Sequence, residues 1–233
     1  MQKYTYKYNT SSLDYLAKKN DADCGAVMIH GYGASMMDLY GLHQFSSSFD
    51  WYFPQGVLSL MGEMSRAWFP IDEQALQSAM MTGHHRDLSL VEPEGLDEVI
   101  DLVANFIHEL PYKKIMLGGF SQGAMLSSHL ISRVEAKLMG VTLFSGNLIH
   151  KNKLEVSLRS CQQQNSIPIF QSHGHQDPIL SFDGARELEK VFKEHGFSVE
   201  FNAFQGQHEI PMDLLNQWAK FMQLCQKHPQ SND

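Results

Sequence analysis

The 233-residue chain contains little cysteine and no long run of basic residues. Its three cysteines, Cys24, Cys161 and Cys225, include no Cys-x-x-Cys pair and are odd in number, which is typical of reduced thiols and argues against a disulfide framework. Lys and Arg number 18 against 26 Asp and Glu, and no basic run is longer than a pair, which argues against nucleic-acid binding. We therefore expect a cytoplasmic protein that binds no nucleic acid.

Export and membrane signals are also missing from the sequence. The first twenty residues alternate Lys with Tyr and include Asp14, so they lack the apolar core of a signal peptide. The longest stretch without a charged residue, 115–132, is interrupted by several glycines, Gln122 and His129. We expect no transmembrane segment.

The composition is that of a folded domain. Hydrophobic residues make up 43% and charged residues 19%, with 17 Gly and 8 Pro, which excludes the disordered and collagen-like classes. The length suits one large α/β domain. We predict a single domain over residues 1–233, with 227–233 as a loose tail.

Short apolar runs alternate with helical periodicity along the chain. An edge strand is expected at 3–8, and buried strands at 24–29, 115–117, 141–144, 167–171 and 199–204. Helices are expected at 36–42, 93–110, 124–134, 184–195 and 212–225, with 11–20 a turn or weak helix and 49–72 a short strand plus a long loop. This order predicts an α/β fold with a mostly parallel central sheet and helices on both faces.

One pentapeptide, Gly119-Phe120-Ser121-Gln122-Gly123, lies between an expected strand and an expected helix. In this context Gly-x-Ser-x-Gly predicts a sharp, strained turn that exposes the serine at the start of the helix. Ser121 is therefore the candidate nucleophile. The alternative is that Ser121 only caps the helix.

A serine nucleophile needs a base, and the chain order in such folds is serine, acid, histidine. His208 follows the expected strand 199–204, at the end of a parallel strand where α/β sheets place their ligands. His129 falls inside a helix, His195 at a helix end, and His228 in the tail. His208 is thus the candidate base.

The candidate acid is Asp177, which follows the strand 167–171 and precedes Pro178. The rival is Asp183, which we interpret as an N-cap of the next helix. We interpret His173 and His175 as part of a turn or as supporting residues, because a lone His-x-His is weak evidence for a zinc site.

Two backbone amides are candidates for binding the oxyanion. One is that of Gln122, directly after the nucleophile, and the other is that of Tyr32 in the His-Gly-Tyr-Gly turn at 30–33. The alternative for 30–33 is an ordinary strand-to-helix turn.

Five segments together resemble the phospholipase/carboxylesterase family of α/β-hydrolases, which includes the acyl-protein thioesterases. They are His-Gly-Tyr-Gly-Ala at 30–34, Arg-Ala-Trp-Phe at 66–69, Gly-Phe-Ser-Gln-Gly-Ala at 119–124, His-Gly-His-Gln-Asp-Pro at 173–178 and Gln-Gly-Gln-His at 205–208. The resemblance covers about 24–222. It implies one compact domain without a large cap, a triad of Ser121, Asp177 and His208, oxyanion amides on Tyr32 and Gln122, and no metal or cofactor.

The chain departs from the family pattern where an acyl group is expected to bind, at Pro70, at 147–149 and at 179–181. The preferred acyl length therefore stays open. Apolar residues of the long loop are candidates for the groove, although such loops more often pack on the core. These residues are Leu60, Met61, Met64, Trp68 and Phe69, of which Trp68, Met61 and Met64 are assigned to substrate. The cluster at 84–86 is expected to be a solvated loop.

The sequence and the resemblance together predict a serine hydrolase. Its substrates are expected to be carboxylic esters or thioesters of small to medium acyl groups, cleaved through an acyl-enzyme. One alternative is a lysophospholipase or lipase for longer chains, and another is a non-catalytic ligand-binding module of the same fold. The chain is expected to be a monomer or a homodimer.

Overall fold

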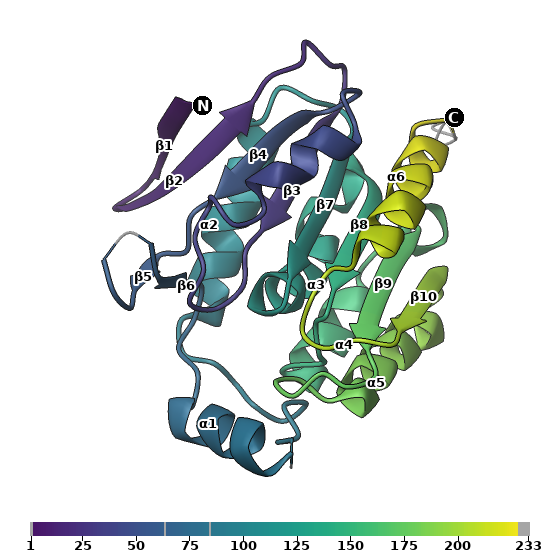
Figure 1. Ribbon diagram of the computed structural model, residues 1–233. Helices are drawn as coiled ribbons and strands as arrows, with labels where there is room; N and C mark the ends of the chain where they lie inside the picture. The colour runs from purple at the N-terminus through teal and green to yellow at the C-terminus, as the bar shows by residue number, and fades with distance from the viewer. Residues whose placement is uncertain (1, 63, 84, 228–233) are drawn as a thin grey trace.

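The computed structural model describes residues 2–62, 64–83 and 85–227 (Figure 1). Its centre is an eight-stranded sheet in the order β1-β2-β4-β3-β7-β8-β9-β10. All neighbours from β4 to β10 pair in parallel, whereas β2 pairs antiparallel with both β1 and β4. The strands are β1 (Gln2–Tyr8), β2 (Ser11–Lys18), β3 (Gly25–Ile29), β4 (Asp50–Pro54), β7 (Ile115–Phe120), β8 (Leu138–Phe144), β9 (Ile169–Gly174) and β10 (Val199–Phe204).

Helices cover both faces of the sheet and bury a separate apolar cluster on each face. On one face lie α2 (Leu96–Glu109), α3 (Gln122–Val134), α4 (Lys151–Arg159) and α5 (Phe182–Glu194), and on the other lie α6 (Met212–Lys227) and the 3₁₀ helix η1 (Tyr40–Phe45). Figure 1 shows α1 (Glu73–Thr82) beyond the end of the sheet toward which β7 and β9 run. This arrangement confirms the predicted α/β-hydrolase fold and leaves α1 beside the carboxyl ends of the strands.

The expectation of a turn or weak helix at 11–20 is wrong, because this segment forms β2. Leu13 and Leu16 are three residues apart, which mimics the period of a helix. In β2 they point to opposite sides of the sheet, with Leu13 in one apolar cluster and Leu16 in the other. Both sides of this strand are covered, so alternation of polar and apolar residues is absent.

Other segments are corrected more locally. Segment 49–72 contains β4 and also a short hairpin of β5 (Leu58–Ser59) and β6 (Arg66–Ala67). The helix expected at 36–42 is a turn followed by η1, and helices α1 and α4 were not anticipated. Lys227, expected in the tail, is the last residue of α6, and the rest of the expected tail, 228–233, lies outside the described residues.

Within the described part of the chain, no helix is both long and apolar enough to cross a lipid bilayer. The prediction for 115–132 is consistent with this, because that stretch divides into β7 and α3.

Candidate active site

Ser121 occupies a sharp turn between β7 and α3. Its backbone has φ 56° and ψ −120°, a strained conformation for a residue with a side chain. A Cβ on Gly123 would lie 1.9 Å from the carbonyl oxygen of Ile29, and one on Gly119 would lie 2.3 Å from the carbonyl carbon of Gly123. Gly119 therefore lets the turn close on the start of α3, and Gly123 lets it pack directly against β3. Ser121 is at the N-cap position, but its side chain makes no capping hydrogen bond, so the capping alternative is wrong.

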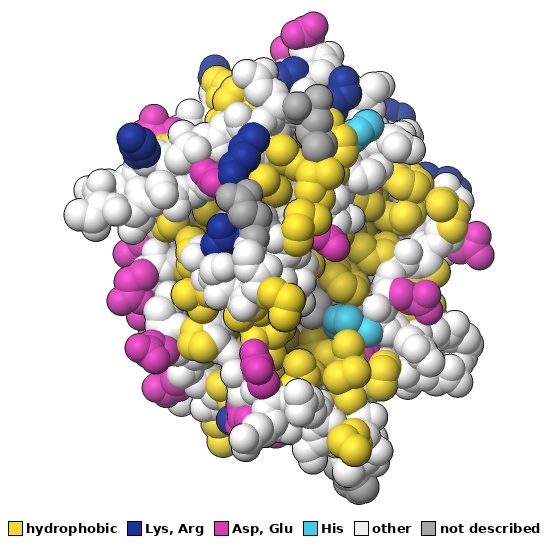
Figure 2. Space-filling view, turned by 60° about the vertical axis from the view of Figure 1, so that its left-hand side comes forward, with side chains coloured by type: hydrophobic (Ala, Val, Ile, Leu, Met, Phe, Trp, Pro, Cys, Tyr) yellow, Lys and Arg dark blue, Asp and Glu magenta, His cyan; other side chains and the backbone are white. Residues whose placement is uncertain are grey.

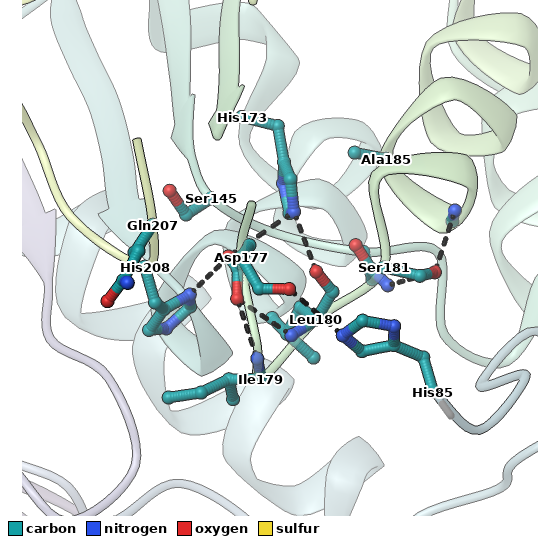
Figure 3. Close-up of polar contacts among 12 residues, drawn as sticks. His85, Ser145, His173, Asp177, Ile179, Leu180, Ser181, Ala185, Gln207 and His208 are labelled. Atoms are coloured by element: carbon teal, nitrogen blue, oxygen red, sulfur yellow. Dashed lines mark hydrogen bonds and ion pairs between the residues drawn. The ribbon is translucent and has the colours of Figure 1, made fainter. Parts of the chain in front are cut away.

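His208 and Asp177 are in direct contact in the site, as Figure 3 shows. His208 Nδ1 lies 2.6 Å from Asp177 Oδ2. The other carboxylate oxygen, Oδ1, accepts the amide N–H groups of Ile179 at 2.8 Å and Leu180 at 2.9 Å. Burial on its own raises the pKa of the Asp177 carboxyl, but His208 and the two amides outweigh burial and hold this pKa below its usual range. Asp177 is thus an anion with a fixed orientation toward His208.

The rival acid, Asp183, lies elsewhere. It is an exposed residue in the first turn of α5, and the N-cap of that helix is Ser181, whose hydroxyl accepts the Gly184 amide at 3.0 Å. Our interpretation of Asp183 as the N-cap is therefore wrong.

The nucleophile turn adjoins the acid and base loops. The ring of Phe120, directly before Ser121, lies 4.8 Å from the ring of His208 between centroids. Ser121 also lines one cavity together with Ile179 and Leu180 of the acid loop. The structure therefore brings the turn after β7, the loop after β9 and the loop after β10 to one edge of the sheet.

Two backbone amides flank Ser121. A Cβ on Gly31 would lie only 3.2 Å from Cβ of Ser121, so the loop after β3 passes directly beside the serine. Among the described residues, the amides of Tyr32 and Gln122 have no acceptor, as is normal for the first residue of a helix such as Gln122. Both are available to a negatively charged oxygen at Ser121.

Side chains hold these two amides in place. The side chain of Gln122 accepts the Trp68 amide at 2.9 Å and donates to the Phe69 carbonyl at 2.8 Å. The hydroxyl of Tyr32 donates to Glu73 Oε1 at 2.5 Å. Burial first, and then this contact with Glu73, raise the pKa of Tyr32 to about 12, so the phenol stays protonated.

A cavity of about 300 Å³ extends from Ser121 toward α1. Figure 2 shows hydrophobic side chains gathered around the hollow on this face of the molecule. Charged side chains also border it, and Arg86 and Asp72 form an ion pair of 3.2 Å there. The apolar lining comes from Tyr32, Phe69, Pro70, Ile71, Ala75, Leu76, Ala79, Leu88, Val91, Pro93, Met125, Ile149, Ile179 and Leu180.

The three residues assigned to substrate from the sequence do not line this cavity. Trp68 is 1% exposed and donates its indole N–H to the His30 carbonyl at 2.9 Å, so it supports the turn at 30–33 from the core. Met61 and Met64 lie on the β5–β6 hairpin and are 80% and 68% exposed. Of the candidates in that loop, Phe69 lines the cavity. The sequence analysis missed α1, whose Ala75, Leu76 and Ala79 carry a helical spacing that faces the cavity.

The remaining histidines have different positions. His173 is buried beside Asp177, whereas His175 is exposed and stacks on Phe182 at 4.2 Å between ring centroids. His85 was expected in a solvated loop, but its Nε2 lies 3.0 Å from the Asp177 carbonyl oxygen. His84, from the same cluster, lies outside the described residues. Among the residues that the structure describes, no group of three or more His, Cys, Asp or Glu side chains has an arrangement that could hold a metal ion.

Comparison with known proteins gives a consistent result. A family model described as Phospholipase/Carboxylesterase matches residues 16–226. Acyl-protein thioesterase 1 of Candida albicans is 26% identical over 230 residues, which cover 92% of this chain and 97% of the relative. Lysophospholipase-like protein 1 of Mus musculus is 26% identical over 170 residues, which cover 68% of this chain and 65% of the relative.

Solved structures share the fold. The crystal structure of Zea mays acyl-protein thioesterase 2 matches with a TM-score of 0.71 at 20% identity, over 91% of this chain and 98% of that one. The crystal structure of Arabidopsis thaliana SOBER1 matches with a TM-score of 0.70 at 22% identity, over 88% of this chain and all of that one (100%).

Proposed function

The chain belongs to the phospholipase/carboxylesterase family of α/β-hydrolases, and from this membership we propose that Ser121, His208 and Asp177 form its catalytic triad. The substrate is a carboxylic ester or thioester of a small to medium acyl group. The observation that carries the proposal is the 2.6 Å contact of His208 Nδ1 with Asp177, in a loop packed against the strained turn at Ser121.

In the first half of the reaction, His208 Nε2 removes the hydroxyl proton of Ser121 as its oxygen attacks the acyl carbonyl carbon. The amides of Tyr32 and Gln122 donate to the carbonyl oxygen as it becomes negative. The imidazolium then gives its proton to the departing alcohol or thiol. This leaves the acyl group bonded to Ser121.

In the second half, the same imidazole removes a proton from water, which attacks the acyl-enzyme. The tetrahedral intermediate collapses, Ser121 recovers its proton from His208, and the carboxylic acid departs. Asp177 keeps the proton of the imidazole on Nδ1 throughout, so that Nε2 is free to act. Because these groups supply nucleophile, base and oxyanion donors, the scheme requires no metal or cofactor.

The size of the cavity supports the acyl assignment. At about 300 Å³ it lies at the lower end of the usual range for ligand sites, roughly 300–1,000 Å³. An acyl chain needs apolar walls, and the lining residues of α1 and of the segment after it supply them. The names of the relatives include both acyl-protein thioesterases and a lysophospholipase-like protein, so a longer lipid acyl chain is the second candidate.

We further propose that the activity resides in one domain and in the cytoplasm. The three triad residues follow strands of one sheet, and the three cysteines are unpaired. The substrate is a small ester or an acylated molecule, and the triad needs one copy of the chain.

The test uses Ser121→Ala, with Ser132→Ala on the same helix as the matched control. We expect Ser121→Ala to lose p-nitrophenyl butyrate turnover at least 10³-fold, and Ser132→Ala to keep it. A fluorophosphonate probe should label the wild type and the control but not Ser121→Ala. Unchanged turnover in Ser121→Ala would contradict the proposal, and absence of labelling in the wild type would favour the non-catalytic binding module.

A further inference from the structure

His173 lies beside the triad acid, yet the proposed mechanism gives it no role. It belongs to β9, four residues before Asp177, and its side chain is completely buried. His173 Nε2 lies 3.3 Å from Asp177 Oδ2 and 3.0 Å from the Leu180 carbonyl oxygen. Figure 3 shows the ring pointing at the carboxylate from the side opposite His208. Two imidazoles thus approach the same carboxylate oxygen.

The neighbours of His173 decide which ring nitrogen carries the proton. Near Nε2 are a carbonyl oxygen and a carboxylate oxygen, which only accept hydrogen bonds. Nε2 must therefore be the protonated nitrogen. Within the described residues, Nδ1 is buried and has no partner, which suits a bare nitrogen and disfavours a second N–H group.

The charge environment also favours the neutral ring. The titratable groups that face His173 are Asp177 from the acid loop, His208 from the loop after β10 and His85 from the segment after α1. Burial is the main cause that lowers the pKa of His173, and the two other histidines lower it further. Leu180 and Asp177 act in the opposite direction but do not outweigh burial. His173 is thus a neutral donor in the working range of the enzyme.

We propose that His173 is a positioning residue that acts through Asp177: its Nε2–H donates to the Leu180 carbonyl and lies beside the carboxylate oxygen that also contacts His208, so the N–H dipole acts on that oxygen. This inference rests on the proposed function. This dipole offsets part of the negative potential at Oδ2, and so limits how strongly Asp177 stabilises the protonated form of the base.

The direction of the expected pH shift depends on how the other carboxylate oxygen of Asp177 is held. Oδ1 stays anchored by the amides of Ile179 and Leu180 when His173 is replaced, so the carboxylate keeps its place. Without the N–H dipole of His173, the negative charge at Oδ2 acts on His208 without this offset. The protonated base is then more stable, and the acid limb of the kcat/KM profile moves to higher pH.

The experiment compares His173→Leu, which removes the donor, with His173→Gln, whose amide nitrogen reaches the position of Nε2. His175→Gln, two residues along and exposed, is the matched control. For His173→Leu we expect the acid limb to rise by about 0.5 to 1 pH unit, with plateau kcat reduced less than tenfold. His173→Gln and His175→Gln should keep the limb of the wild type within about 0.2 unit.

If soluble His173→Leu shows the same acid limb of the kcat/KM profile as the wild type, the inference is overturned. A purely structural role would lower the amount of active protein without shifting its pH profile. If His173→Leu does not fold, ¹⁵N-histidine NMR of the wild-type protein decides. We expect neutral His173 with the proton on Nε2 at pH 7, and a proton on Nδ1 would contradict the proposal. If the wild type has no esterase activity, the proposed function fails, and the NMR result still judges the placement of the proton.

Discussion

The hydroxyl of Tyr32 donates a 2.5 Å hydrogen bond to Glu73, which joins the loop after β3 to the first turn of α1. Tyr32 provides a proposed oxyanion amide, and α1 forms a wall of the cavity. Glu73→Ala should therefore lower kcat on p-nitrophenyl butyrate by about three- to tenfold, because an exposed hydrogen bond to a charged group contributes only about 1 kcal/mol. The measurement is steady-state kinetics with Tyr32→Phe, Glu73→Ala and the double variant.

The double-mutant cycle supplies the control for this prediction. If the two side chains act through their contact, the double variant should lose little more activity than either single variant. Fully additive losses would contradict a coupling between Tyr32 and Glu73.

The cavity predicts how acyl length can be changed. Ala79 is 4% exposed and lines the cavity, so Ala79→Phe should fill part of it. We expect kcat/KM for p-nitrophenyl octanoate to fall about tenfold or more, while the acetate ester is nearly unaffected. A series of esters graded by acyl length measures this effect.

Met80, the next residue on α1, is 53% exposed and serves as the matched control. Met80→Phe adds a ring to the outer side of the helix and should leave the length preference unchanged. An equal loss for all esters in Ala79→Phe would mean that the acyl chain binds elsewhere.

Two buried histidines predict a loss of stability in acid. Burial lowers the pKa of both His30 and His129 to about 4, from an ordinary value near 6.5. Between these values the unfolded chain binds protons that the folded chain does not, so stability is fully present above pH 6.5 and falls as the pH drops toward 4. The expected slope is at most about 1.4 kcal/mol per pH unit for each histidine.

Urea denaturation at several pH values between 7 and 4.5 measures this slope. His129→Gln keeps a donor for the Ile149 carbonyl but does not titrate, so it should reduce the pH dependence by the contribution of one histidine. An unchanged slope in this variant would show that His129 titrates alike in the folded and unfolded chains.

The glycines of the turn at Ser121 predict a strong backbone effect. Gly123→Ala places a methyl group 1.9 Å from the Ile29 carbonyl oxygen, and the nearest atoms all belong to the backbone, so no side chain can give way. We expect about 3 kcal/mol or more of destabilisation, or insoluble protein. Gly41→Ala is the control, since its Cβ meets nothing within 4 Å and should cost under about 0.5 kcal/mol. Similar urea midpoints for both variants would contradict the packing described for the turn.

The sequence was sufficient to predict the parallel sheet and to place Ser121, Asp177 and His208 at one edge of it. Each follows an apolar strand, and the carboxyl ends of parallel strands lie together. The pairing of His208 with Asp177 over Asp183 followed from their positions after strands. Ser181 is the N-cap because it directly precedes the first residue of α5, whereas Asp183 already lies in the first turn of that helix.

The walls of the cavity could not be predicted in the same way. Apolar residues in a loop suggest a substrate groove. In the structure, however, the β5–β6 hairpin leaves Met61 and Met64 exposed, and Trp68 is buried in the core. Which residues form the walls depends on where α1 packs against the rest of the molecule. No local sequence pattern predicts that packing. His173 was similarly ambiguous, because residues two apart in a strand point to the same side. His173 is buried because it lies in β9, whereas His175 follows the end of that strand and is exposed.

The order of the strands has a consequence for how the molecule matures. The turn that carries Ser121 follows β7 in the middle of the sheet, whereas His208 follows β10, which forms the far border of that sheet. A refolding chain can assemble its reactive groups only after this last strand has docked on β9. Recovery of turnover after dilution from denaturant should therefore lag behind recovery of the helical circular dichroism signal. The rate at which turnover returns would then measure the final step of folding.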